Sequence, residues 1–199
     1  RTSSVVGCAH STIAAVTSPQ APDDLPEPPR GAPWDAPWPE CPRVLLDCEM
    51  TGTDPARDAI VEVALTRVEG GAVTERLVSL VHTDVASSPE ALAVHGIDPA
   101  ALEGAPTFAD LAPAVAAMLE GAVPVAHDPS LDRVFLDAAF AAAGSDARLG
   151  AAIDTLHLSR RAVLARSYQL GALCAGLGFA PRRWHRAGED VRGLEDLFD

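Results

Sequence analysis

The chain has 199 residues, of which 48% are hydrophobic, and its formal net charge at neutral pH is −13. This length suits one domain of about 150 residues with an appendage, and the hydrophobic content is sufficient for a proper core. So acidic a chain lacks the basic surface of an ordinary nucleic-acid-binding protein, unless bound cations supply positive charge locally.

Cysteine usage indicates the redox compartment, and hydropathy bears on a membrane location. The four cysteines, Cys8, Cys41, Cys48 and Cys174, show neither a C-x-x-C pair nor the spacing of metal ligands. This pattern favours free thiols in a reducing compartment. No apolar run approaches the length of a membrane span, so we expect a cytoplasmic protein with no membrane partner.

Residues 1–42 are rich in proline, alanine, serine and aspartate, and this composition cannot build a core. We expect them to form a disordered N-terminal tail. The segment Val5-Val6-Gly7-Cys8 resembles a bacterial lipobox, but it lacks the apolar stretch that a signal peptide needs, so we do not assign it that role. The pattern of a folded domain covers residues 43–199.

The folded pattern opens with three strands, which the apolar and alternating residues place at 43–49, 60–68 and 73–82. Gly70-Gly71 predicts a tight hairpin turn between the second and the third. Two further short strands are expected at 123–127 and around Ile153. Capping residues and helical periodicity predict helices at 89–95, 110–120, 130–143, 155–164, 168–176 and 187–199.

The order of these elements predicts the fold class. Strands come first and then alternate with helices, which indicates an α/β domain with a mixed sheet of about five strands flanked by helices.

One residue tests the helix boundaries. Pro113 is compatible with the helix at 110–120 only if it lies in the first turn, where a backbone N–H is not needed.

Two carboxylates lie at the end of the first strand. Because side chains on a strand alternate between faces, Asp47 and Glu49 point to one side and Leu46 and Cys48 to the other. Carboxylates this close repel each other unless a cation lies between them, and oxygen ligands select hard cations such as Mg²⁺ and Mn²⁺. The glycine that follows, Gly52, allows the backbone to approach a ligand.

Two more acids begin the buried stripes of helices. Asp132 leads the apolar stripe of the helix at 130–143, and Asp190 leads that of the last helix. Asp132 is therefore either a partner of the helix dipole or a ligand directed at the edge of the sheet. On the same helix, Arg133 and Asp137 form an i, i+4 pair that we expect to face water.

One histidine lies five residues before the last of these acids. His185 belongs to the sequence Pro-Arg-Arg-Trp-His-Arg at residues 181–186. Taken singly, it would be an exposed loop histidine in an ordinary solvated run of arginines. Next to Asp190, the same residues describe a cationic loop that carries a side chain able to exchange protons near neutral pH.

Three segments, at 47–52, 127–132 and 185–190, resemble the three motifs of the DEDDh family of 3′→5′ exonucleases. This family includes the proofreading epsilon subunit of bacterial DNA polymerase III, ribonuclease T and oligoribonuclease. The segments His95-Gly96-Ile97 and Ile153-Asp154-Thr155-Leu156 match as well, so the resemblance covers about residues 43–199. It implies a ribonuclease H-like domain.

The resemblance also implies the chemistry. Asp47, Glu49, Asp132 and Asp190 would hold two divalent ions, Mg²⁺ or Mn²⁺, and His185 would be the general base. A single-stranded 3′ end would be the substrate and a 5′-mononucleotide the product, with a DNA polymerase subunit or a second copy of the chain as a partner. The residues expected to contact the terminal nucleotide are Met50, Thr51, Gly52, His95 and Ile97.

Two departures from the family pattern leave alternatives open. Asp128 stands where the family usually has asparagine, and Leu131 stands where it has phenylalanine. The added charge of Asp128 allows a second reading, in which the chain is a nuclease-like binding or scaffold module that has lost turnover. A third reading is an oligoribonuclease-like enzyme acting on short RNA. The sequence does not choose between DNA and RNA, because that choice depends on contacts to the sugar 2′ position.

Overall fold

A mixed five-stranded sheet forms the centre of the molecule, with the strand order β3-β2-β1-β4-β5. The computed structural model describes residues 29–198. The strands are β1 (Arg43–Met50), β2 (Ile60–Glu69), β3 (Ala72–Leu80), β4 (Val123–Ala126) and β5 (Ile153–Asp154). β1 pairs antiparallel with β2 and parallel with β4, while β2 and β3 form the expected hairpin. The α/β class and the mixed sheet are confirmed.

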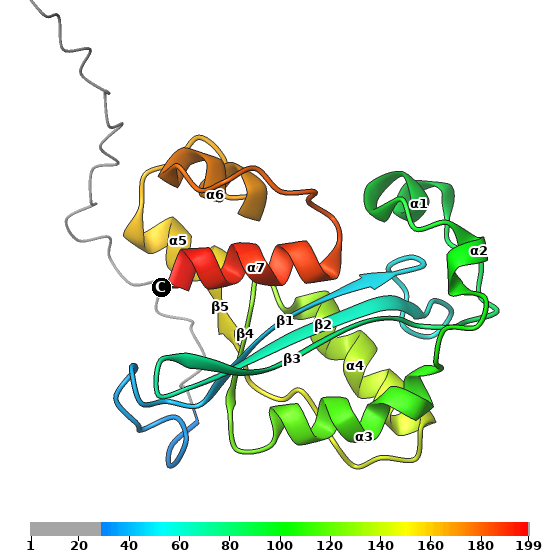
Figure 1. The fold of residues 1–199 in the computed structure, drawn as a ribbon, viewed down its shortest axis with the longest axis horizontal. Helices are drawn as coiled ribbons and strands as arrows, with labels where there is room; N and C mark the ends of the chain where they lie inside the picture. The colour runs from blue at the N-terminus through cyan, green and yellow to red at the C-terminus, as the bar shows by residue number, and fades with distance from the viewer. Residues whose placement is uncertain (1–28, 199) are drawn as a thin grey trace, which may run out of the picture.

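Helices cover both faces of this sheet (Figure 1). α7 lies along one face with α6 behind it, α3 and α4 cover the other face, and α1 and α2 lie beyond the ends of β1 and β2. Their bounds are α1 (Pro89–His95), α2 (Pro99–Leu102), α3 (Phe108–Leu119), α4 (Ser130–Ala142), α5 (Thr155–Ala162), α6 (Leu170–Leu177) and α7 (Ala187–Phe198).

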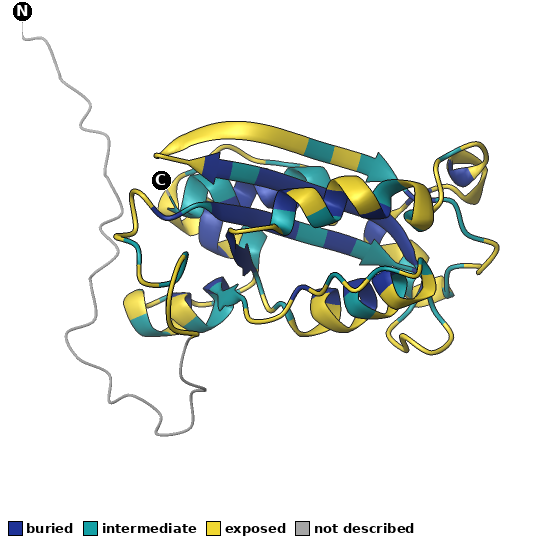
Figure 2. Cartoon of the chain, turned by 90° about the horizontal axis from the view of Figure 1, so that it is seen from below, coloured by how far each residue is buried: buried dark blue, intermediate teal, exposed yellow. Residues whose placement is uncertain are grey.

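The alternation of β1 divides the core into two layers. Leu46 and Cys48 belong to the cluster that packs under α3 and α4, whereas Leu45 belongs to the cluster under α7. β1 and β2 are largely buried, and β3 is the exposed edge of the sheet (Figure 2). Asp47 and Glu49 have the parity of Leu45, so they extend the α7 side of β1 past the end of the apolar core.

The predicted helix at 110–120 begins earlier than expected. Thr107 caps α3 in a reciprocal box with Asp110, so the helix starts at Phe108 and Pro113 lies in its second turn. The expectation that Pro113 occupies the first turn is therefore wrong. Pro113 lacks the N–H that would bond to the carbonyl of Ala109, a residue on the exposed side of the helix. The short helix α2 was not predicted.

A predicted surface pair on α4 is also corrected. Asp137 does not face water beside Arg133, because its Oδ1 accepts a hydrogen bond from the backbone N–H of Leu149 at 2.9 Å and the residue is half-buried. Asp137 thus holds the segment that returns from α4 to β5. Cys41, Cys48 and Cys174 are free, as expected, and all three are buried.

The expected tail at 1–42 is described only in part. Residues 1–28 lie outside the described residues. In the remainder the chain forms turns, and the ring of Trp38 lies 5.3 Å from that of Phe198 in α7 and 4.9 Å from the guanidinium of Arg43. These contacts attach the segment just before β1 to the domain. None of the helices in the described part combines the length and the apolar character that a membrane crossing requires.

Candidate active site

The site begins where β1 leaves the core. Asp47 and Glu49 are half-buried, and Glu49 stands opposite Glu62 in the antiparallel register of β1 and β2. Asp132 joins them from the first turn of α4. It is 6% exposed, and its Oδ1 accepts a hydrogen bond from the backbone N–H of Cys48 at 2.9 Å. The side chain of Asp132 is thus directed at the sheet, and its role as a ligand stays a prediction.

Asp190 and His185 join the site from α7 and the loop before it, on the face of the sheet opposite to α4. Asp190 lies in the first turn of α7, and its Oδ2 accepts a hydrogen bond from the backbone N–H of His185 at 3.0 Å. Potential ligand atoms of Glu49, His185 and Asp190 all lie within 4.8 Å of one another. The site therefore joins β1, α4 and α7.

His185 has a φ of 63°, in the left-handed region that residues other than glycine rarely occupy. Such a conformation costs free energy and persists only where the surrounding structure imposes it. Here two contacts fix the backbone on both sides of the histidine. The N–H of His185 donates a hydrogen bond to Asp190, and the next residue, Arg186, forms an ion pair with Glu62.

The electrostatics show that the acids share one place. Burial raises the pKa of Asp47 well above its usual range, and the nearby charges of Asp132, Asp190 and Glu49 raise it further. Burial raises the pKa of Glu49 to about 8, that of Asp132 to about 7 and that of Asp190 to about 6. Carboxylates that repel in this way provide a strong site for a divalent cation.

Sequence reasoning missed one ion pair of the site. Glu62 on β2 is 3% exposed and binds the Arg186 guanidinium through two hydrogen bonds, of 3.0 and 2.6 Å. The backbone N–H of Ala187 donates a third hydrogen bond to Glu62, at 2.9 Å. The pair anchors the start of α7 directly after His185. A glutamate inside the apolar run of β2 was the available signal, because a buried charge requires a partner.

Trp184 anchors the other side of His185. A Cβ at Gly171 in α6 would lie 2.9 Å from atoms of the Trp184 ring, and one at Gly193 in α7 would lie 2.6 Å from it. The ring is thus held between the two helices, against a glycine of each. The sequence signal was the pair of glycines inside predicted helices.

We predict that Gly193→Ala destabilises the protein by about 1–3 kcal/mol, because the new methyl group overpacks the tryptophan ring. The matched control is Gly176→Ala in α6, where an added Cβ meets nothing within 4 Å. That substitution should stabilise the protein by up to about 1 kcal/mol through helix propensity alone. Urea denaturation of both variants measures the difference, and equal effects would contradict the packing of Trp184.

A cavity of about 500 Å³ lies between Glu49 and α1, and we call it the terminal cavity. Met50, Gly52 and His95, three of the five residues expected at the terminal nucleotide, line it, and their contact with a nucleotide stays a prediction. The other two, Thr51 and Ile97, are buried and do not line it.

The hydroxyl of Thr51 instead supports the following loop, because it donates to Asp58 at 3.2 Å and accepts from the N–H of Ala59 at 3.0 Å. Gly52 is required by the same loop, since a Cβ there would collide with the Asp58 carboxylate. His95 accepts the N–H of Ile97 at Nδ1, so its Nε2 carries the proton; within the described residues this buried N–H has no partner.

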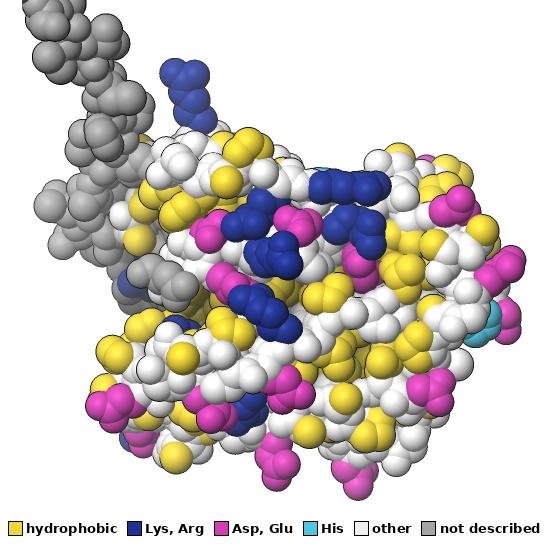
Figure 3. Space-filling model, in the orientation of Figure 1, with side chains coloured by type: hydrophobic (Ala, Val, Ile, Leu, Met, Phe, Trp, Pro, Cys, Tyr) yellow, Lys and Arg dark blue, Asp and Glu magenta, His cyan; other side chains and the backbone are white. Residues whose placement is uncertain are grey.

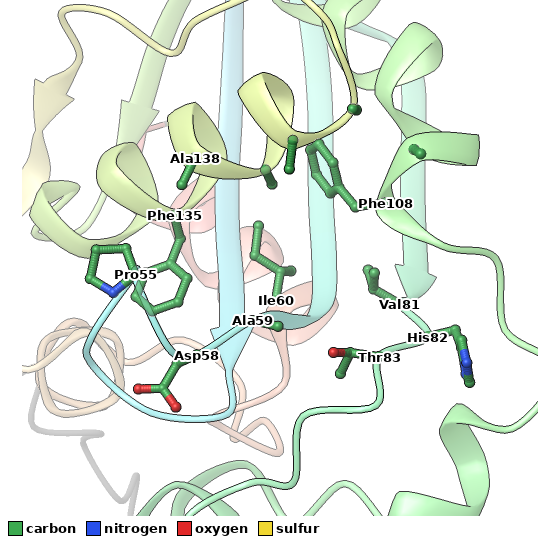
Figure 4. A pocket seen from close by; sticks show the side chains of 14 residues that line it. Pro55, Asp58, Ala59, Ile60, Val81, His82, Thr83, Phe108, Phe135 and Ala138 are labelled. Carbon is green, nitrogen blue, oxygen red and sulfur yellow. The ribbon is translucent and has the colours of Figure 1, made fainter.

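A second cavity of about 500 Å³ lies on the other side of the acids, and we call it the central cavity. Asp47, His185 and Asp190 line it together with the first turn of α6 and Trp184. A third cavity, largely apolar and of about 310 Å³, lies between α3, α4 and the start of β2. Phe108, Phe135 and Ile60 surround it, and Asp58 lines both this cavity and the terminal cavity (Figure 4).

Comparison with known proteins agrees with this geometry. The family model described as "RNase_T: Exonuclease" matches residues 44–198. The "DNA polymerase III PolC-type" of Thermotoga maritima is 30% identical over 155 residues, and the match covers 78% of this chain and 11% of that protein. The "3′-5′ exonuclease DinG" of Staphylococcus haemolyticus is 31% identical over 148 residues, covering 74% of this chain and 16% of that protein. The chain thus spans only a small part of these relatives.

Solved structures support the fold. Exonuclease I of E. coli in complex with a dT13 oligonucleotide superposes with a TM-score of 0.71 at 18% sequence identity, over 79% of this chain and 40% of that one. The sheet and its flanking helices therefore form a ribonuclease H-like fold. With the family model matched over nearly the whole folded part and the three motifs meeting at one site, the chain belongs to the exonuclease family, of the DEDDh type.

Proposed function

We propose that residues 43–199 form a 3′→5′ exonuclease domain that releases 5′-mononucleotides from the 3′ end of a single-stranded nucleic acid. The observation that carries this proposal is the convergence of Asp47, Glu49, Asp132 and Asp190 beside His185, between two cavities. The membership in the exonuclease family and the single-stranded oligonucleotide bound to the similar E. coli exonuclease I support the same substrate class.

The acids fit the divalent ions that such a reaction uses. Their donors are carboxylate oxygens, which suit Mg²⁺ or Mn²⁺, and their raised pKa values reflect a repulsion that a cation would remove. We propose that the four carboxylates hold two ions. When bound, these ions would supply positive charge to the phosphate and to the attacking and leaving oxygens of an in-line displacement.

The protein's own side chains have separate roles in this proposal. We propose that a ring nitrogen of His185 takes the proton from the attacking water, because this side chain lies within reach of Glu49 and Asp190 and is exposed to the central cavity. Asp190 orients it through the backbone, and the Glu62–Arg186 pair fixes the start of the helix that follows. Positioning of this kind lowers the entropy cost of reaching the transition state.

The terminal cavity is the proposed site of the leaving nucleotide. Met50 and Gly52 form the wall next to Glu49, and the Nε2–H of His95 provides a donor that has no protein partner among the described residues. Burial lowers the pKa of His95, so the ring is neutral near pH 7 and offers a hydrogen bond rather than a charge. Thr51 and Ile97 contribute by holding the wall in place.

The test uses single-stranded DNA and RNA oligonucleotides labelled at the 5′ end, with Mg²⁺, Mn²⁺ or EDTA. We expect stepwise shortening that requires metal, immediate release of a 3′-terminal label as a mononucleotide, and resistance of a strand blocked by a 3′-phosphate. Binding without shortening would favour the scaffold alternative that Asp128 raised. Shortening of RNA alone, restricted to a few nucleotides, would favour the oligoribonuclease-like alternative. Association with a polymerase or a second copy remains a prediction.

Metal-free protein should lose stability as the pH rises. Acids with raised folded-state pKa values stabilise the fold below their unfolded value, about 4, and this contribution is lost as the pH passes the folded values of about 6 to about 8. In EDTA we expect a melting temperature several degrees lower at pH 8 than at pH 5. Excess Mn²⁺ should reverse this loss at pH 8, by about 2.7 kcal/mol at a hundred times its Kd.

The control for this melt is Asp47→Asn, which removes one of the repelling charges. In EDTA the variant should melt at or above wild type at pH 8, fall less between pH 5 and pH 8, and respond weakly to Mn²⁺. A wild-type melting temperature that metal does not change would mean that the four acids do not form one site.

A further inference from the structure

A third polar cavity continues the active site toward α5. It has a volume of about 500 Å³, and we call it the α5 cavity. His127 and Gln169 line both this cavity and the central cavity, so the two cavities adjoin; we call the pair the track, which begins at Asp47 and Asp190. On the far side, the track reaches Arg160 at the end of α5.

The wall shared by the two cavities is fixed. His127 Nε2 lies 2.8 Å from the carbonyl oxygen of Tyr168, which can only accept, so this nitrogen carries the proton. Its Nδ1 then accepts from the Thr155 hydroxyl, also at 2.8 Å. Burial lowers the pKa of His127, so the ring is neutral and both bonds are kept near pH 7. The histidine thus ties β4 to α5 and to the loop before α6.

Arg160 is the cation of this track. It is exposed and, among the described residues, makes no ion pair. Several arginines of α7, β3 and the loop before α7 differ because acids neutralise them, and Figure 3 shows arginine and acidic side chains next to one another on that face. Examples are the pairs Arg76–Glu195, Arg182–Asp196 and Arg192–Glu189. In a chain with a net charge of −13, an unpaired arginine on a cavity continuous with the active site is a specific attraction for a phosphate.

The two ends of the site give the strand a direction. The terminal cavity lies on the α1 side of Glu49, and the central and α5 cavities lie on the other side of the acids. If the leaving nucleotide occupies the terminal cavity, the strand upstream of the scissile phosphate must continue through the other two. Gln169, exposed and lining both, offers an amide to this strand.

We propose that the α5 cavity binds the sugar–phosphate backbone upstream of the scissile bond, with Arg160 contacting a phosphate there. The proposal rests on the proposed exonuclease function and deepens it, because it assigns the enzyme a strand that extends beyond the two nucleotides flanking the cleaved bond. It sets the chain apart from an enzyme specialised for dinucleotides.

The experiment compares Arg160→Ala with Arg161→Ala, a control in the same last turn of α5 that lines none of the three polar cavities. Two substrates are used with Mn²⁺: an oligothymidylate of five nucleotides, and the p-nitrophenyl ester of thymidine 5′-monophosphate, which has no upstream strand. For Arg160→Ala we expect a KM for the pentanucleotide about tenfold higher with little change in kcat, and a salt slope reduced by about one phosphate contact. Hydrolysis of the ester should stay at the wild-type rate.

Equilibrium binding keeps the proposal testable if turnover fails. With Ca²⁺ in place of Mn²⁺, fluorescence anisotropy of the labelled pentanucleotide should show about tenfold weaker binding to Arg160→Ala and wild-type binding to Arg161→Ala. Equal binding to both variants, whether weakened or not, would overturn the α5 assignment. A wild-type protein that binds the strand in this manner but hydrolyses neither substrate would overturn the proposed function and leave the α5 cavity as a strand-binding site.

A substitution at Asp128 should have the opposite effect on binding of the strand. Asp128 lines the α5 cavity, as Arg160 does, is exposed, and accepts a hydrogen bond from the Ser130 hydroxyl at 2.8 Å. Its φ of 62° lies in the left-handed region, which asparagine tolerates well. Asp128→Asn should therefore keep the turn, remove one charge that repels a phosphate, and leave the KM for the pentanucleotide equal or lower. A higher KM would show that Asp128 assists binding and would contradict the charge argument.

Discussion

Asp47→Asn is expected to abolish hydrolysis of oligonucleotides, leaving less than a few per cent of the wild-type rate. Asparagine keeps the shape of the side chain but removes a charge from a site whose proposed metal ligands are all carboxylates. Burial raises the pKa of Asp47, and the charges of the other three acids of the site, Asp132, Asp190 and Glu49, raise it further. The loss should therefore be as large as for any single substitution, and Glu49→Gln should behave in the same way.

The measurement is the initial rate of shortening of a 5′-labelled strand at saturating Mn²⁺. Glu75→Gln is a matched control, because Glu75 is exposed on β3 and outside the three polar cavities. It removes the same charge from the same sheet and should retain the wild-type rate. A folded Asp47→Asn protein that keeps more than a few per cent of the activity would remove Asp47 from the metal site.

The placement of the four acids could be predicted from local periodicity. A strand with alternating faces puts Asp47 and Glu49 on one side, and a helix whose apolar stripe begins at Asp132 or Asp190 turns that residue toward the core. Periodicity shows which face of an element is buried. Each of these acids lies on the buried face of its element, at the end of that face. The sheet order then brings β1, α4 and α7 together, as the ribonuclease H-like resemblance implied.

The parts that hold His185 could not be predicted in the same way. Glu62 and Arg186 are 124 residues apart in sequence, so no local pattern connects them, although the buried glutamate signalled that a partner exists. In the sequence, the glycines around Trp184 indicate only a lower helix propensity. The structure gives their reason, which is that the tryptophan ring packs against them. Thr51 matched a substrate-contacting position, but its hydroxyl is used by the neighbouring loop. Each case depends on which element packs against which, and sequence spacing does not contain that information.

Loss of the His185 imidazole should lower kcat by about 10²–10⁴-fold, the usual contribution of a general base. Alanine alone is an imperfect test, because the residue has a φ of 63° and alanine is strained there. His185→Asn avoids this, since asparagine accepts the left-handed conformation. In both variants the hydrogen bond to Asp190 comes from the backbone N–H and is retained.

The readout that separates a base from a structural residue is the division between turnover and metal binding. If His185 acts as the base, both variants lose kcat to a similar extent, while the Mn²⁺ concentration for half-maximal stabilisation in a thermal melt stays close to that of wild type. If His185 is instead a metal ligand, as its distance to Glu49 and Asp190 permits, metal affinity falls together with kcat. A wild-type rate in His185→Asn would exclude both roles. Because asparagine tolerates the left-handed backbone of residue 185, the comparison of wild type with His185→Asn depends on the imidazole alone.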